Sequence, residues 1–496
     1  MIKAQYQTYT FSGETCKAVG QSVVECRLPA LEVAKVLNVD GVATLLDSTC
    51  ENGEVKYSGK LLLTVLYEDA EGKINRAERG AEFYHKAEGE KIAPAHFAVG
   101  SIDVTNISVR REGSSVFIAA TCLSSFAVYG RKEVRYLAGG EGLALKKEEG
   151  AFTRVVPASV TFEEEDDFET EYAEGVLSHT ERTFVTAAVC SHGQVEVSGE
   201  IGLGLCILKR DGTLCAYERL IPFSAQVPCD EAAPLTPADA AVRVTETLVT
   251  VQADEDKGTA RIGVNLTLHA DVKAFVKEDA VLCVDAYSPS FEVTIEKQNE
   301  VGRYLTNEKI FTERIVCQPL FTTPIEEGAR FKAVVSPTAT VTSSVGGEAA
   351  QVEGVIEAKL LCEEEGGGYA CKEFSMPFVA RLPIRCEEVE VEALACGVGV
   401  RRRAGGETEA EATLKLRVKA FERKETAFIC SLEEGEAREE NDAAISVYLP
   451  KAGDDLWTTA KRLSQFPEDF EKCNEGLSFP LRGDERLLIY RQKGEK

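Results

Sequence analysis

Apolar and polar residues alternate with a period of two along most of the chain. In the stretch that follows Gly59, every second residue is hydrophobic, and the same alternation follows Gly199 and Gly354. Successive side chains of a β-strand point to opposite faces of the sheet, so this pattern predicts strands that bury one face. Helical patterns are few outside the C-terminal segment. The sequence therefore predicts a mainly β protein.

The alternating stretches belong to a repeat that occurs three times. Each copy has an anchor glycine, a second glycine 13 residues later (72−59, 212−199, 367−354) and a phenylalanine 24 residues later (83−59, 223−199, 378−354). The anchors are 140 and 155 residues apart (199−59, 354−199), so the repeated unit is a whole domain. The turn between the strands is rich in Asp and Gly, which predicts a hairpin in each copy. The three triplets are Gly59, Gly72 and Phe83; Gly199, Gly212 and Phe223; and Gly354, Gly367 and Phe378.

Each copy also ends on an alternating strand that closes with an aromatic residue. These closing aromatics are Tyr129, Phe275 and Phe421. Strands of this kind with Gly and Asp turns predict three antiparallel modules of β-sandwich or barrel-like form. We place the modules at 1–150, 151–300 and 301–431, and expect them to form beads joined by restricted linkers.

Two stretches, 161–175 and 432–442, are strongly acidic. Such charge runs are typical of solvated linkers or edge segments, and the alternative is an acidic docking strip for a basic partner. We assign 432–443 as an acidic linker. We also expect proteases to cut near 163–171 or 433–442.

The segment 444–492 departs from the repeat. It begins with an alternating strand at 445–449, and Asp455 then occupies the N-cap position of a predicted helix. The apolar face of that helix consists of Leu456, Ala460 and Leu463. Pro467 suits the first turn of a second helix, and 487–490 predicts a closing strand. The order strand, helix, helix, strand indicates a small α+β domain.

Composition and charge limit the classes of function. Hydrophobic residues make up 44% of the chain and charged residues 28%, which is typical of a folded protein. Its 82 acidic and 56 basic side chains give a net charge of −26, which disfavours nucleic acid and anionic lipid as partners. No apolar run approaches the roughly 20 residues that span a bilayer, so no integral membrane segment is expected.

The candidate chemistry is sparse. The 16 cysteines are scattered without a CxxC motif, which favours reduced, buried thiols in a cytoplasmic protein over zinc or redox sites. The five histidines form no HExxH motif. The glycine-rich stretch at Gly202 lacks the third glycine and the following helix of a dinucleotide-binding loop, and that at Gly366 lacks the Lys-Ser/Thr that follows a phosphate-binding loop. We therefore expect no enzyme activity, no catalytic residues, no metal and no cofactor.

The C-terminal segment resembles the LysM module in KAGDDLWTTAKRL, PEDFEKCN and LSFPLRGDERLLIY. The matching positions are Gly453, Asp454, Leu456, Trp457, Ala460, Asn474, Pro480, Gly483 and Leu487. Asp455 replaces the usual threonine-type cap, and Arg482, Gly483 and Asp484 replace the usual PGQ turn. LysM modules bind N-acetylglucosamine polymers through two loops, and the acidic rim makes a protein ligand at least as plausible here. The resemblance places partner or glycan binding on Asp454, Asp455, Leu456, Asn474, Glu475, Gly476 and Leu477.

Three β modules followed by one LysM-like domain resemble the SPOCS-domain proteins of endospore-forming bacteria. The strand and turn signature around Gly59, Gly199 and Gly354 carries this second resemblance. It implies a non-enzymatic scaffold in the mother-cell cytoplasm, at the forespore surface or spore coat. Its LysM module would bind a coat basement-layer protein, the morphogenetic ATPase SpoIVA. The alternative is a peptidoglycan-binding protein of the cell wall or cortex, in which the repeats are a spacer.

Overall fold

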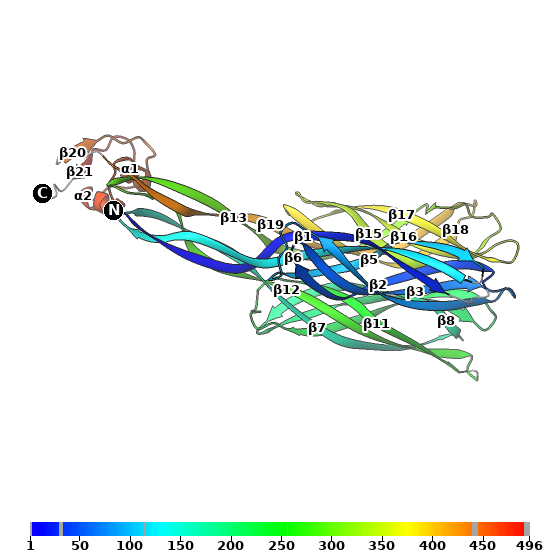
Figure 1. Ribbon diagram of the computed structural model, residues 1–496. Coiled ribbons are helices and arrows are strands. Elements are labelled where there is room, and N and C mark those ends of the chain that lie inside the picture. Colours follow the sequence, from blue (N-terminus) through cyan, green and yellow to red (C-terminus); the bar gives the residue numbers. More distant parts are fainter. Residues whose placement is uncertain are drawn as a thin grey trace.

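The computed structural model describes residues 2–28, 33–113, 115–171, 173–254, 256–438 and 445–490. The chain is mainly β and antiparallel, which confirms the predicted fold class. Figure 1 shows an elongated molecule with a broad head, a narrow stalk and a small C-terminal domain at the far end of the stalk. The N-terminus lies near the same end.

The first module is one bent sheet with the strand order β2-β3-β4-β1-β6-β5. Its end strands β2 and β5 pack against each other, so the sheet folds over its own core in the manner of a sandwich. The strands are β1 (Lys3–Leu28), β2 (Lys35–Glu51), β3 (Glu54–Glu68), β4 (Ile74–Glu88), β5 (Phe97–Glu112) and β6 (Ser115–Glu141).

The second and third modules repeat this plan with two sheets each. The sheets of the second module have the orders β10-β9-β8 and β11-β12-β7, and those of the third β14-β17-β16-β15 and β13-β19-β18. The strands of the second module are β7 (Ala144–Glu171), β8 (Ala173–Ser191), β9 (Gln194–Lys209), β10 (Leu214–Pro228), β11 (Ala238–Asp254) and β12 (Thr259–Tyr287). Those of the third are β13 (Phe291–Cys317), β14 (Leu320–Phe321), β15 (Arg330–Val345), β16 (Ala350–Glu363), β17 (Tyr369–Leu382), β18 (Glu388–Arg402) and β19 (Thr408–Ala437).

The spacing that the three copies of the repeat share has a direct structural cause. Each anchor glycine and the phenylalanine 24 residues later are paired across the hairpins β3–β4, β9–β10 and β16–β17. The ring covers the glycine so closely that a Cβ there would lie within 3.0 Å of ring atoms. The second glycine of each copy has a positive φ, between 77° and 87°, which the turn requires. The three predicted hairpins are confirmed.

The modules pack side by side around a shared core in the head. Seven residues after each anchor glycine lies an apolar residue whose side chain points away from the core of its own module. These residues are Leu66, Cys206 and Leu361, which are 2%, 1% and 0% exposed and belong to one cluster. The prediction of beads joined by linkers is therefore wrong, because each hairpin carries apolar residues on both faces at this end.

The stalk (Figure 1) consists of three two-stranded ribbons, one from each module. The paired stretches are 3–12 with 131–141, 144–155 with 275–287, and 291–305 with 421–437. Eight residues after each closing aromatic, Leu137, Cys283 and Ile429 meet in a buried layer of the stalk. The module limits predicted at 150 and 300 lie inside β7 and β13, because these strands continue unbroken from the stalk into the head.

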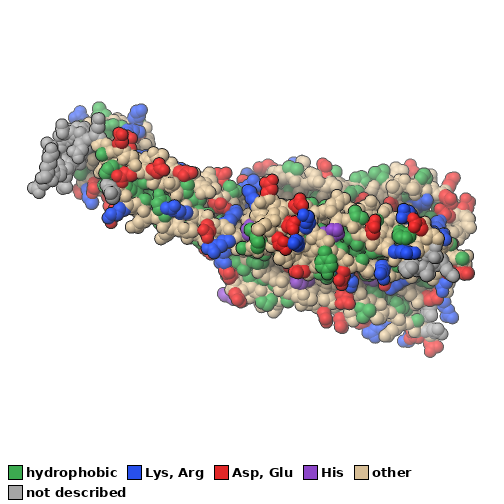
Figure 2. Space-filling model, viewed as in Figure 1, with side chains coloured by type: hydrophobic (Ala, Val, Ile, Leu, Met, Phe, Trp, Pro, Cys, Tyr) green, Lys and Arg blue, Asp and Glu red, His purple; other side chains and the backbone are tan. Residues whose placement is uncertain are grey.

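The described parts of the acidic stretches lie almost entirely in strands. Residues 161–171 lie in β7, an end strand of its sheet, so the edge interpretation holds and the linker interpretation is wrong. Alternate acids of β7 face solvent, whereas Asp166 pairs with Arg219 of β10. The linker predicted at 432–443 begins inside β19, and its part from 439 lies outside the described residues. On the face seen in Figure 2, acidic side chains are spread over the head, stalk and C-terminal domain.

The C-terminal domain has the predicted order of elements: β20 (Ile445–Tyr448), α1 (Leu456–Arg462), α2 (Pro467–Cys473) and β21 (Leu487–Tyr490). Residues 444, 491 and 492 of the predicted domain lie outside the described ranges. Asp455 caps α1 by accepting a hydrogen bond from the Thr458 amide at 2.6 Å, and Pro467 opens α2, as predicted. Among the described residues, no helix is long and apolar enough to cross a membrane.

Candidate functional site

The first predicted binding loop, 454–456, is held by its own side chains. Asp454 accepts hydrogen bonds from the Lys451 amide at 3.0 Å and from Arg462 at 2.9 Å. The Arg462 hydrogen bond, with that of the Lys451 amide, holds the pKa of the Asp454 carboxyl below its usual range. Leu456 packs against the domain core. Asp455 is exposed while it caps α1, so its carboxylate lies at the rim of the domain.

The second predicted loop, 474–477, divides into a structural part and an exposed part. The Asn474 side chain is buried, donates to the carbonyls of Phe470 and Leu488, and accepts from the Leu488 amide. It therefore ties α2 to β21 and is not presented to a partner. Glu475 and Gly476 are exposed, and Gly476 has the positive φ of 87° that its turn requires, while Leu477 is half-buried.

Main-chain hydrogen bonds join the first loop to the segment that follows the second. The Gly453 amide donates to the Leu481 carbonyl at 2.8 Å, and the Leu481 amide donates to the Asp454 carbonyl at 2.9 Å. The loops are thus fixed to one small body. Asp455 and Glu475, which we call the rim acids, are the two predicted binding residues with exposed carboxylates. Within the described part of the chain, neither forms an ion pair with a basic side chain.

The C-terminal domain contacts the stalk through residues that the sequence pattern did not bring together. The indole of Trp457 donates to Asp285 at 2.8 Å, and the Lys461 ammonium lies 2.7 Å and 2.8 Å from the two oxygens of the same carboxylate. Tyr287 donates to the carbonyl of Gln465 at 2.6 Å. More than 170 residues separate the partners in sequence, so no local pattern could indicate this contact.

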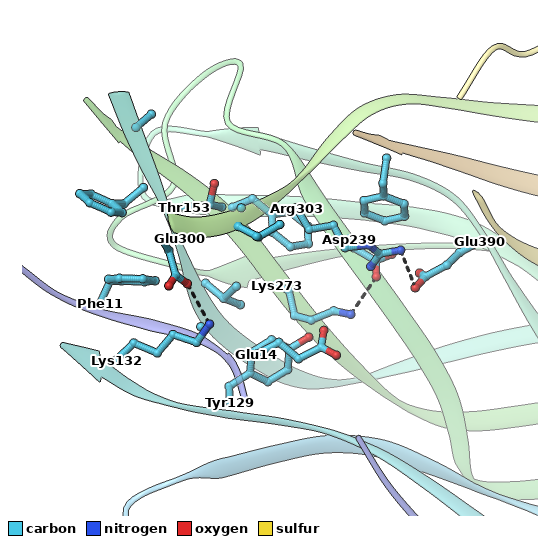
Figure 3. Close-up of a pocket in the computed structure, with 18 residues that line it drawn as sticks. Phe11, Glu14, Tyr129, Lys132, Thr153, Asp239, Lys273, Glu300, Arg303 and Glu390 are labelled. Atoms are coloured by element: carbon cyan, nitrogen blue, oxygen red, sulfur yellow. Dashed lines mark hydrogen bonds and ion pairs between the residues drawn. The ribbon is translucent and has the colours of Figure 1, made fainter. Parts of the chain in front are cut away.

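A cavity of about 110 Å³ lies where the three modules meet at the base of the stalk (Figure 3). All three closing aromatics, Tyr129, Phe275 and Phe421, line it, which explains why each repeat ends on an aromatic residue. The basic side chains of the wall are each paired with an acid: Lys132 with Glu300 at 3.0 Å, Lys273 with Asp239 at 3.0 Å, and Arg303 with Glu390 at 2.9 Å. The Lys132–Glu300 pair joins the first module to the third, whereas the other two pairs lie within the second and third modules.

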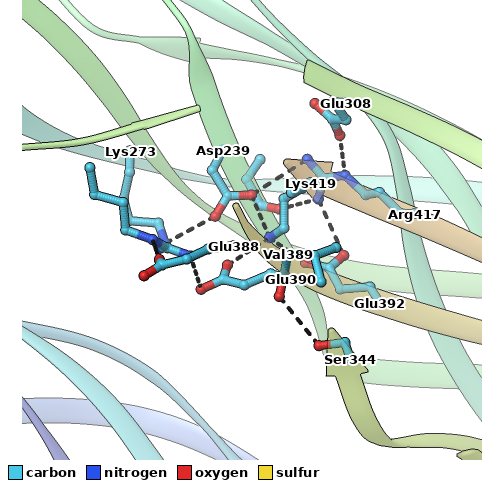
Figure 4. A network of polar contacts seen from close by, with 12 residues as sticks. Asp239, Lys273, Glu308, Ser344, Glu388, Val389, Glu390, Glu392, Arg417 and Lys419 are labelled. Carbon is cyan, nitrogen blue, oxygen red and sulfur yellow. Dashed lines mark hydrogen bonds and ion pairs between the residues drawn. The ribbon is translucent and has the colours of Figure 1, made fainter. Parts of the chain in front are cut away.

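Beside the cavity lies a network of buried and half-buried charges that joins the second and third modules (Figure 4). Arg417, whose side chain is fully buried, contacts Glu308 and Glu392 of its own module and donates to the Ala240 carbonyl of the second at 2.9 Å. Asp239 accepts from Lys419 at 3.0 Å across the same boundary. We call this set the central network. It consists of Asp239, Lys273, Glu308, Glu390, Glu392, Arg417 and Lys419.

The shifted pKa values of two residues in the central network make its contribution to stability depend on pH. Burial disfavours the charged form of Asp239, but Lys419, Lys273 and Arg417 outweigh burial and hold the pKa of its carboxyl well below the usual range. Burial likewise opposes the charge of Lys273, yet Asp239 raises the pKa of its ammonium. Asp239 and Lys273 are therefore both charged between the unfolded pKa values of Asp and Lys, about 4 and about 10.

We predict that acid weakens this junction. Because the folded pKa of Asp239 lies below its unfolded value, its stabilisation is present above about pH 4 and is lost as pH falls towards the folded pKa. Urea unfolding of the wild type and Asp239→Asn at pH 7, 5, 4 and 3 measures this, and the difference in free energy between the two chains should shrink below pH 4. A difference that stayed constant over this range would contradict the assignment.

Among the described residues, no group of three or more His, Cys, Asp or Glu side chains could hold a metal ion. Fifteen of the 16 cysteines are buried or half-buried free thiols, and Cys473 is exposed. In the comparisons with known proteins, no family model, no curated protein and no solved structure matches the chain. The LysM and SPOCS resemblances therefore rest on the motif residues themselves.

Proposed function

We propose that the protein is a non-enzymatic scaffold of endospore coat assembly that binds a coat morphogenetic protein through its C-terminal domain. The layout resembles that of SipL-like proteins with SPOCS domains, and the proposed partner is a basement-layer protein of the SpoIVA type. The proposed place of action is the mother-cell cytoplasm at the forespore surface.

The observation that carries this proposal is the placement of the C-terminal domain. It lies at the far end of a stalk built from all three modules, and the modules are joined below it by a shared apolar core and the central network (Figure 1). Such a body holds one small domain at a fixed distance from a large head. This geometry suits an adaptor that connects two layers.

The rim acids supply a direct test of protein binding. Replacing Asp455 with Asn and Glu475 with Gln in the same chain should weaken binding to the purified basement-layer protein about tenfold, because two exposed charges that face a basic surface are lost. Asn is as good an N-cap as Asp, so α1 should stay intact. Calorimetric titration at low and at moderate salt measures the two affinities. The difference in affinity between the variant and the wild type should be smaller at the higher salt concentration.

Asp469→Asn is the matched control, because Asp469 is an exposed acid of α2 outside both binding loops. It should bind like the wild type. Equal affinity of the rim variant and the wild type would count against the rim as the protein-binding surface. Retention of the chain on purified peptidoglycan, with no binding to the basement-layer protein, would favour the glycan-binding alternative.

A further inference from the structure

The hydrophobic core of the C-terminal domain continues into the tip of the stalk. Tyr287, at the end of β12, is only 1% exposed and its ring centroid lies 5.0 Å from that of Trp457 in an edge-on arrangement. Ala144 and Val293 of neighbouring stalk strands belong to the same apolar cluster as Phe470 of α2. The domain is thus completed by residues of the second and third modules.

Asp285 fixes the orientation of this contact. Trp457 and Lys461 are four residues apart on α1, so they lie on one face of the helix, and both bind the same carboxylate. Burial opposes ionisation of Asp285, but the hydrogen bonds from Lys461 and Trp457 outweigh it and hold the pKa of the carboxyl below its usual range. A charged carboxylate with two donors on one helix face permits little rotation of α1.

The docked helix directly follows the first binding loop. Trp457 is two residues from the rim acid Asp455, so the stalk tip lies beside the rim. The Thr458 amide chiefly, and the nearby charge of Lys146 in addition, lower the pKa of Asp455. Lys146 belongs to β7 of the stalk. A partner that engages Asp455 therefore also meets the stalk.

We propose that the partner-binding surface is a composite of the rim and the stalk tip, with Asp285 as the positioning residue that holds the two together. This inference rests on the proposed function and extends it from the C-terminal domain to the full chain. A surface built from two modules and a domain suits a folded protein, which can contact both parts at once. A single extended glycan chain would need only the two loops of the C-terminal domain.

Trp457 is the one tryptophan of the sequence, so its fluorescence reports the docking. In the full chain, Asp285→Ala should increase acrylamide quenching of Trp457 at least twofold and lower its fluorescence anisotropy, because the indole loses its acceptor and α1 is released. Asp285→Asn keeps an acceptor for the indole but loses the charge opposite Lys461, so an intermediate effect is expected. Asp279→Ala is the matched control, since Asp279 is an exposed acid of the same strand that pairs with Lys277.

Binding of the same chains to the purified basement-layer protein completes the test. Asp285→Ala should bind about tenfold more weakly than the wild type, and Asp279→Ala should bind equally well. Undocking of Trp457 without loss of affinity would overturn the composite surface and leave the proposed function standing. Unchanged quenching and anisotropy in both Asp285 variants would overturn the positioning role. A wild-type chain that failed to bind the protein would overturn the proposed function itself.

Discussion

Replacement of Arg417 by alanine is expected to lower the free energy of unfolding by about 3–5 kcal/mol, because removing one member of a buried ion network leaves its partners uncompensated. The Arg417 side chain is 0% exposed and lies against the carboxylates of Glu308, Glu392 and Asp239. Without it, Glu308 loses the arginine that it contacts, while Glu392 and Asp239 keep only lysine partners. Urea unfolding followed by far-UV circular dichroism measures the loss.

The control for this substitution lies in the same sheet. Arg314 pairs with Glu411 across β13 and β19, but its side chain is 71% exposed. Arg314→Ala should change the free energy of unfolding by no more than about 0.5 kcal/mol, because exposed ion pairs contribute little. Similar small effects of both substitutions would contradict the view that the central network joins the second and third modules.

Substitution of the anchor glycine Gly199 by alanine should cost about 2–3 kcal/mol of unfolding free energy, at the upper end of the range for overpacking. A Cβ at this position would overlap both the ring of Phe223 and the carbonyl oxygen of Phe184. The first neighbour is a side chain that can be replaced, whereas the second is backbone. Thermal unfolding of the variant measures the loss.

The equivalent position in the first module provides the comparison. At Gly59 the close atoms all belong to the ring of Phe83. Phe83→Leu should therefore recover part of the stability lost in Gly59→Ala, while Phe223→Leu should recover less in Gly199→Ala. Gly175→Ala is a neutral control, since a Cβ there meets nothing within 4 Å. Full tolerance of alanine at both anchors would show that ring stacking on glycine does not explain the repeat.

The period-two pattern was sufficient to predict the strands, the three hairpins and the mainly β class. It could not predict how the modules meet, because alternation defines the faces of a strand and not what covers them. The available signal was the break in alternation at Leu66, Cys206 and Leu361, where apolar residues occupy both faces in succession. The same reasoning applies to the stalk, whose buried layer follows the closing aromatics at a fixed offset of eight residues (137−129, 283−275, 429−421).

The candidate site was predictable only where local rules act. The N-cap role of Asp455 follows from its place before an apolar helical face, and the structure confirms it. The structural role of Asn474 depends on a strand 14 residues away, and that of Asp285 on a helix more than 170 residues away. Long-range pairs of this kind leave no mark on spacing, so they emerge only from the folded chain.

The most direct test of the proposed scaffold is a parallel binding measurement on the full wild-type chain. Calorimetric titration with the purified basement-layer protein and co-sedimentation with purified cortex peptidoglycan use the same preparation. We predict saturable binding to the protein, weakened by loss of the rim acids, and no comparable retention on the glycan. Tight retention on peptidoglycan, with no binding to the basement-layer protein, would contradict the account.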